Sequence, residues 1–152
     1  MLDLTPPFPE EVLTEIGRVA VAATKLEFML AQFASETCGN MPAADLLSRP
    51  GRVLPAARQA ADSLEPSIAR LFRQWVDHAE QLLDERHRVI HSIWMLRAAA
   101  PGVAQYFAQH PRTKHLMDAE PDAIGDIAAQ LNKCSDDGFT LIFTNASRLR
   151  AN

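Results

Sequence analysis

The sequence has little of what marks secreted or membrane-spanning proteins. Its 152 residues contain only two cysteines, Cys38 and Cys134, which are too few for a disulfide scaffold and lack the spacing of a metal site. No run approaches the roughly 20 apolar residues that cross a bilayer. Residues 1–7 lack the basic and apolar regions of a secretory signal. We therefore expect a cytoplasmic protein without membrane contact, whose cysteines act as small apolar fillers.

Several common functional motifs are also missing. The chain has no P-loop, no Gly-x-Gly-x-x-Gly and no Gly-x-Ser-x-Gly sequence, so the nucleotide and serine-hydrolase sites built on them are not predicted. We expect no cofactor. The net charge of −4 argues against a generic nucleic-acid coat, because binding to phosphates favours a basic protein face.

Acidic residues are absent from one stretch, residues 86–115, which we call the acid-free segment. The chain has 19 Asp and Glu residues, and all of them lie outside it. A local anion-facing surface on an otherwise acidic protein would explain this distribution. Sampling noise in a short segment is the alternative. The basic residues and histidines of the segment are Arg86, Arg88, Arg97, Arg112 and Lys114, with His87, His91, His110 and His115.

Four segments show the 3.6-residue apolar period of amphipathic helices, at about 10–37, 52–64, 66–91 and 120–149, with a short turn near 43–47. Gly39 or Asn40 suits a left-handed cap after the first helix, and Gly138 is a candidate bend in the last. We expect an all-α fold, an up-and-down bundle of four main helices forming a single domain over residues 1–152. The expected inward residues include Val12, Ile16, Val19, Ala20, Ala23, Leu26, Leu30 and Phe33 of the first helix, and Ile68, Leu71, Phe72, Trp75, Ala79, Leu82 and Ile90 of the third.

Roughly 28 residues between the third and fourth main helices have no helical period. Residues 93–96 and 103–107 are suited to two short strands around Pro101 and Gly102. A loop of this length in a compact domain usually is functional or contains an element of its own. We expect an insertion at about 92–119, either a β-hairpin or an irregular flap beside the end of the third helix.

Arg86 interrupts the apolar stripe of the third helix. Continuing the steps from Ala79 and Leu82 leads to Arg86, so this arginine is predicted to face the interior. A charge at such a position costs several kcal/mol unless it is compensated. Glu27 on the first helix is the candidate partner. The departure from the pattern makes this region the first place to look for a function.

The sequence Arg86-His87-x-x-x-His91 resembles the Arg-polar-x-x-x-His signature of the HEPN superfamily, small helical bundles many of which are ribonucleases of toxin–antitoxin and phage-defence systems. The position of the motif at the end of a long third helix is similar too, and the resemblance extends over residues 10 to 150. Asparagine is more usual than histidine after the arginine. In a longer form of the signature, this chain has Ser92 where glycine is common and keeps Trp94.

The resemblance implies a metal-independent RNA endonuclease, such as a toxin or defence component, with Arg86 and His91 as the catalytic pair. It also implies a homodimer, with RNA as substrate and an antitoxin or another protein as partner. The chemistry is suitable, because histidine exchanges protons near neutral pH and arginine directs several donors at phosphate oxygens. The expected supporting or substrate-binding residues are His87, Arg88, Glu27, Trp94 and Arg97.

The spacing of Arg86 and His91 raises a geometric problem. Five residues correspond to about 140° of rotation, so the two side chains do not share a face of a regular helix. They can converge if the helix loosens after Ile90. Alternatively, two subunits supply one another's groups, which is the route that the resemblance implies.

Other interpretations of the same residues remain open. Arg86 can be a structural residue whose stem packs and whose head reaches solvent, in a non-catalytic HEPN-like module that binds a protein partner or a nucleotide-like anion. Glu80, Asp84, His87 and His91 lie on one helical face, as metal ligands do. However, a di-iron bundle needs a second Glu-x-x-His helix, and the zinc motif needs a glutamate after its first histidine. No metal site is therefore predicted.

Overall fold

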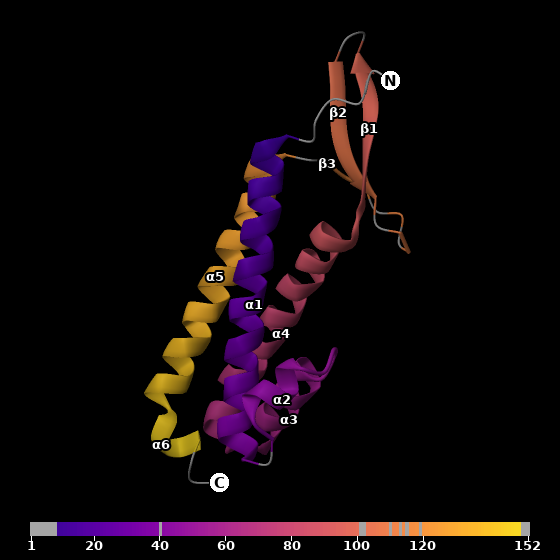
Figure 1. Cartoon of the computed structure of the whole chain (residues 1–152). Coiled ribbons are helices and arrows are strands. Elements are labelled where there is room, and N and C mark those ends of the chain that lie inside the picture. Colours follow the sequence, from indigo (N-terminus) through magenta and orange to yellow (C-terminus); the bar gives the residue numbers. More distant parts are fainter. Residues whose placement is uncertain are drawn as a thin grey trace.

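The computed structural model describes residues 9–39, 41–100, 103–109, 111, 112, 114, 116–118 and 120–149. Three long helices dominate it, namely α1 (Glu10–Cys38), α4 (Pro66–His91) and α5 (Pro121–Thr144). The shorter helices are α2 (Ala43–Leu47), α3 (Val53–Ser63) and α6 (Ala146–Leu149). Between α4 and α5 in the sequence lies an antiparallel sheet of three strands. These are β1 (Ile93–Ala100), β2 (Val103–Gln109) and β3 (Leu116–Asp118). The predicted helical class is confirmed (Figure 1).

The helix ends follow the local sequence signals. Gly39 adopts a left-handed conformation with φ of 64°, and its N–H donates to the carbonyl of Ser35 at 2.9 Å. Helices α4 and α5 both begin at a proline, Pro66 and Pro121, where the missing N–H is not needed by the helix. Asp122 adds a negative charge at the positive end of α5.

Helix α4 runs opposite to α1 and α5 (Figure 1). Arg58 of α3 pairs with Glu80, whereas the later Asp62 pairs with the earlier Arg73, so α3 and α4 are antiparallel. Along α5, Gly125 lies against Glu15 and Asp136 pairs with Lys25, so α5 and α1 are parallel.

The expected alternation of direction among the four main helices is therefore wrong. The first two of them, α1 and α3, run the same way, since each is antiparallel to α4. The chain must return between Cys38 and Val53, and this short return contains α2. A five-residue helix leaves too weak a period to be counted as a main helix, which is why the sequence did not reveal the return.

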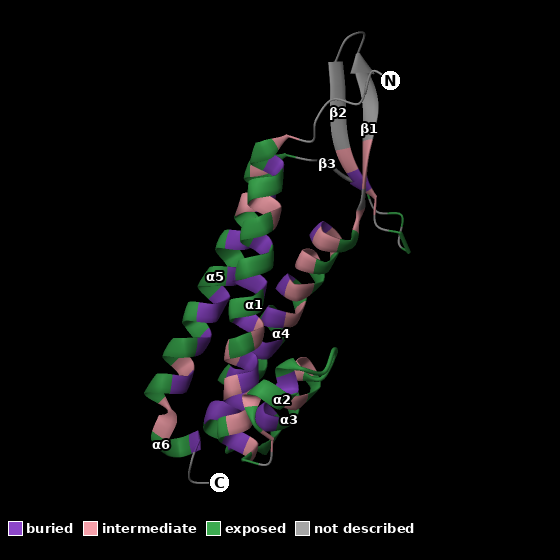
Figure 2. Cartoon of the chain, viewed as in Figure 1, coloured by how far each residue is buried: buried purple, intermediate pink, exposed green. Residues whose placement is uncertain are grey.

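The core lies where α1, α3, α4 and α5 face one another, and the buried positions in Figure 2 follow these inner sides. The rings of Phe33 and Phe72 stack with centroids 4.5 Å apart. Trp75 meets both rings edge-on, at 5.8 and 6.4 Å. Its indole Nε1 donates to the backbone carbonyl of Cys134 at 2.8 Å, so α4 is tied to α5 by a buried hydrogen bond.

Gly138 explains how the indole fits between the helices. Helix α5 is continuous through Gly138, the residue that the sequence marked as a candidate bend. A Cβ added there would lie 2.1 Å from Cζ2 of Trp75, closer than real atoms approach. The glycine is required by the close approach of a side chain, and its φ angle is not the reason.

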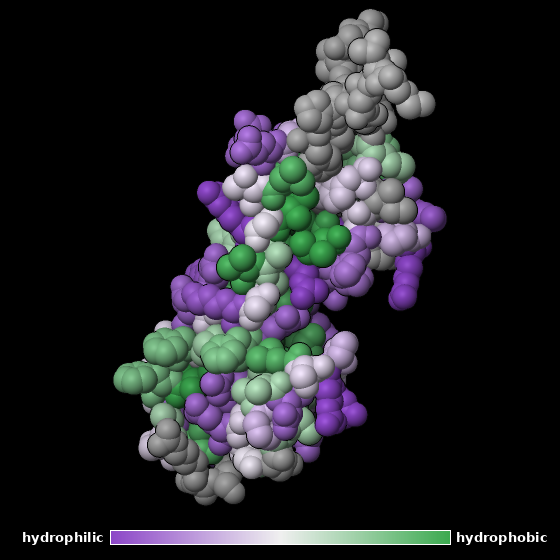
Figure 3. Space-filling view, viewed as in Figure 1, coloured by the Kyte–Doolittle hydropathy of each residue, from purple (hydrophilic) through white to green (hydrophobic). Residues whose placement is uncertain are grey.

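The predicted inner faces are slightly too wide. Leu71 of α4 is 47% exposed, and Ala20 of α1 is exposed as well. Both sit at the edge of an apolar stripe, where one step of 100° decides between the core and solvent. The face drawn in Figure 3 also shows patches of apolar residues between the polar ones. The exposed large apolar residues among those described are Leu13, Val21, Phe28, Leu47, Leu71, Leu116, Phe139 and Phe143.

The expected hairpin within 92–119 is present and longer than predicted. Strands β1 and β2 pair with Trp94 opposite Ala108 and Met95 opposite Phe107, and β3 adds to β2. The turn that was expected at Pro101 and Gly102 lies outside the described residues. The sheet follows α4 directly and extends past that end of the helices (Figure 1). None of the helices in the described ranges has the length and apolar character to cross a membrane.

Candidate functional site

The candidate site is centred on the last two turns of α4. The helix remains regular through His91, and the extended conformation begins at Ser92, with φ of −73° and ψ of 148°. The hydroxyl of Ser92 donates to the carbonyl of Arg88. This hydrogen bond satisfies one of the last carbonyl groups of the helix, which have no N–H partner within it. Since φ at Ser92 is negative, a glycine is not required there. Of the two routes to convergence, loosening of the helix after Ile90 is not seen, since α4 continues through His91.

Arg86 points towards α1 and contacts Glu27. Its Nη2 donates to Oε1 of Glu27 at 3.0 Å, across 59 positions of sequence. The two side chains are 25% and 32% exposed, so the pair lies at the edge of the interior. The contact occurs where the sequence suggested it. A guanidinium has five N–H donors, so the single bond to Glu27 leaves others for a second partner.

His91 faces away from this ion pair and lies beside His87. Both histidines are exposed, and their ring centroids are 4.3 Å apart with planes inclined by 40°. Residues four apart share a helix face, which accounts for the contact. Because α4 stays regular, Arg86 and His91 of one chain do not converge on a common point.

The predicted supporting residues Arg88, Trp94 and Arg97 differ in their surroundings. Arg88 is half-buried and its Nη1 donates to Oε1 of Glu85 at 2.7 Å. Glu85 was not predicted as a partner of Arg88, although a spacing of three residues is the ordinary signal for such a pair. Trp94 is partly buried and packs against the core. The side chain of Arg97 lies outside the described part of the structure.

The remainder of the acid-free segment is described only in part. Arg112 and Lys114 are exposed in the connection that follows β2. Lys114 has a φ of 57°, in the left-handed region that side-chain-bearing residues rarely adopt. His110 and His115 lie outside the described residues, as does the side chain of Tyr106. Two exposed basic groups therefore lie in the connection between β2 and β3.

No cluster of three or more metal-ligating side chains occurs among the described residues. Of the four residues that share one face of α4, Glu80 is engaged by Arg58 of α3. The rings of His87 and His91 lie against each other on that face. A closed structural metal site of four protein ligands is thus not formed by this part of the chain.

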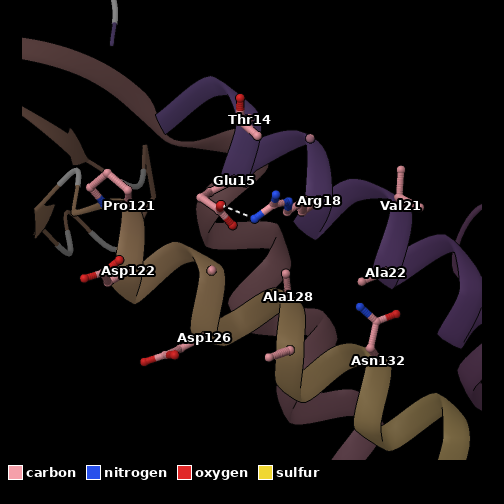
Figure 4. Close-up of a pocket in the computed structure, with 13 residues that line it drawn as sticks. Thr14, Glu15, Arg18, Val21, Ala22, Pro121, Asp122, Asp126, Ala128 and Asn132 are labelled. Atoms are coloured by element: carbon pink, nitrogen blue, oxygen red, sulfur yellow. Dashed lines mark hydrogen bonds and ion pairs between the residues drawn. The ribbon is translucent and has the colours of Figure 1, made fainter. Parts of the chain in front are cut away.

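A separate open groove of about 960 Å³ lies between the first halves of α1 and α5 (Figure 4). On the α1 side of the groove, Arg18 and Glu15 form an ion pair at 2.6 Å. On the α5 side, Asp122 and Asp126 line the groove. The charge of Arg18 is compensated by Glu15, and the two aspartates add negative charge to the groove. The groove is therefore unsuited to a polyanion. It contains none of the site residues that the sequence predicted.

Comparison with known proteins gives no match to a family model, to a curated protein or to a solved structure.

Proposed function

We propose that the protein is a metal-independent RNA endonuclease of HEPN type, built on a four-helix bundle and active as a homodimer. The observation that carries the proposal is an exposed histidine in the last turn of α4, on the same helix as a partly exposed arginine that is hydrogen-bonded to Glu27. RNA cleavage without a metal needs these two kinds of group.

Arg86 would stabilise charge on the phosphate. Its stem is held between α4 and α1, and Glu27 fixes one edge of the guanidinium. The remaining N–H groups can donate to the non-bridging oxygens as negative charge develops on them. Anchoring by Glu27 reduces the conformational entropy that would be lost on binding phosphate.

His91 would transfer protons. As a base it removes the proton of the ribose 2′-hydroxyl, and the 2′-oxygen then attacks the adjacent phosphorus. The bond from phosphorus to the 5′-oxygen breaks, which leaves a 2′,3′-cyclic phosphate and a 5′-hydroxyl. The 5′-oxygen takes its proton from a second histidine acting as acid, and a second copy of the chain supplies one in its own His91.

A second copy also answers the geometric problem of the single chain. The rotation of about 140° between Arg86 and His91 prevents one regular helix from presenting both groups to one phosphate. A two-fold axis near the ends of two α4 helices would place the arginine of one copy opposite the histidine of the other. Such an interface is self-complementary, as in most homodimers.

One observation favours a different function. The bond between Arg86 and Glu27 is what a structural ion pair would also show, because it compensates a cation on a core-facing position. In that case the protein is a non-catalytic HEPN-like dimeric module that binds a protein partner, such as an antitoxin, or a nucleotide-like anion. RNA would then not be turned over.

The test compares RNA cleavage by wild type and by His91→Ala, purified in parallel to equal purity. We expect wild type to cleave in the presence of EDTA and to leave 2′,3′-cyclic phosphate ends. His91→Ala should lose at least about 100-fold in rate, the usual contribution of a general acid or base. Unchanged circular dichroism would show that its fold is intact.

His78→Ala is the matched control, since His78 is an exposed histidine of the same helix outside the site. It should cleave like wild type. Equal cleavage by all three proteins would identify a contaminating nuclease and contradict the catalytic assignment. No turnover by pure wild type, on any RNA tested, would favour the binding module.

A further inference from the structure

The two imidazoles at the end of α4 have a property that does not depend on RNA cleavage. His87 and His91 are both exposed, lie one helical turn apart, and have ring centroids separated by 4.3 Å. Their spacing of four residues makes both side chains leave the helix on the same side. Two nitrogen donors are therefore held close together on a rigid element.

We propose that His87 and His91 together chelate one transition-metal ion of the Ni²⁺, Cu²⁺ or Zn²⁺ class, with water completing its coordination. Neutral imidazole is a preferred ligand for these ions. Each ring has two nitrogens, so one can bind the metal while the other donates to a neighbouring group, as is usual for metal-bound histidines. The helix holds both donors in place, so the second bond forms at a high effective concentration.

The electrostatic surroundings favour a cation at this position. The carboxyl end of α4 carries the partial negative charge of the helix dipole. Asp84 is an exposed carboxylate three residues before His87, on the same face. The nearby guanidinium groups of Arg86 and Arg88 are each paired with a carboxylate, which weakens their repulsion of a metal ion.

The number of ligands determines the kind of site. The described residues form no cluster of three ligating side chains, so Asp84 does not join the two imidazoles as a third ligand. Two protein ligands give a weak, exchangeable site with open positions, unlike the closed four-ligand sites that hold structural zinc. If the ribonuclease proposal also holds, a metal bound to His91 would occupy the nitrogen that transfers protons, and the ion would act as an inhibitor.

The test is calorimetric titration of Ni²⁺ chloride into the protein, prepared without a histidine tag and with accessible thiols alkylated. We expect one Ni²⁺ per chain in wild type. Each of His87→Ala and His91→Ala should weaken binding by about tenfold or more, because one donor of the chelate is lost. His78→Ala, which removes an exposed histidine of the same helix, should bind like wild type.

Three outcomes would contradict the site. They are no binding by wild type at Ni²⁺ concentrations on the order of 1 mM, unchanged binding by both variants of the pair, or an equal loss in His78→Ala. Because the titration contains no RNA, its failure is separable from failure of the proposed function. A protein that cleaves RNA but does not bind Ni²⁺ would contradict the metal-site proposal alone. A protein that binds Ni²⁺ but does not cleave RNA would contradict the ribonuclease proposal alone.

Discussion

Glu27 of α1 accepts a hydrogen bond from Arg86 of α4 at 3.0 Å, and this contact joins the two helices next to the candidate site. Replacing Arg86 by alanine removes the packed stem and leaves a carboxylate at the edge of the interior without its cation. We expect Arg86→Ala to lower the free energy of unfolding by about 1–2 kcal/mol, as measured by urea denaturation.

The size of this effect also bears on function. A loss of about 3 kcal/mol or more would be the behaviour of a buried structural pair and would support the binding module. Glu27→Gln should weaken stability in the same direction. The control Glu36→Gln, at an exposed position of α1, should stay within about 0.5 kcal/mol of wild type.

Gly138→Ala should be destabilising although alanine is the better helix former. The new Cβ would lie 2.1 Å from Cζ2 of Trp75, so the indole must move away from the Cys134 carbonyl that it contacts. Overpacking of this kind costs about 1–3 kcal/mol. Urea denaturation would measure the loss. A variant as stable as wild type would contradict the prediction, because the indole could then adopt another position without cost.

Gly17→Ala is expected to have the opposite sign. Gly17 is exposed in the middle of α1, and a Cβ added there meets no atom within 4 Å. Alanine should therefore raise the free energy of unfolding by about 0.5–1 kcal/mol, since it loses less backbone entropy in a helix. The paired comparison of Gly17 and Gly138, made under one set of denaturation conditions, separates helix propensity from packing.

The two cysteines should differ in reactivity. Burial raises the pKa of the Cys134 thiol to about 11, whereas Cys38 is half-buried. Since the thiolate is the reactive form, the folded protein should show one thiol that reacts promptly with Ellman's reagent at pH 8 and a second that reacts on unfolding. Cys38→Ser should abolish the prompt reaction. A rapid second equivalent in the native state would contradict the buried position of Cys134.

The raised pKa of Cys134 also predicts an effect of pH on stability. In the unfolded chain the thiol ionises near its ordinary pKa of 9.0, so the unfolded state loses the proton before the folded state does. Stability should fall as the pH rises from about 9 to about 11. Urea denaturation across this range, compared with Cys134→Ala, isolates the contribution. An identical fall in the variant would assign it to other groups.

The sequence was informative where one physical signal dominated. The long apolar periods located the main helices, Gly39 ended α1 as expected, and the inward position of Arg86 pointed to Glu27. The direction of α3 was not predictable, because it depends on a five-residue helix and a short return. Leu71 was misplaced for a similar reason, since a residue at the edge of a stripe is buried only if a neighbouring helix reaches it.

The candidate site was predictable in part. Spacing alone brought His87 and His91 together, because that contact lies within one helix. The tight fit of Trp75 against Gly138 joins residues of two different helices, and a single sequence contains no signal for such a contact. The same limit applies to the second copy of the chain that would complete a shared active site.

The packing of α1 against α5 has a consequence for how the chain folds during synthesis. These two helices make the most extensive contact in the described structure, yet they lie near opposite ends of the sequence. The inner side of α1 therefore stays without its main packing partner until the ribosome has made residues 121–144. Contacts of such long range slow folding and leave an apolar surface open to chaperones in the meantime.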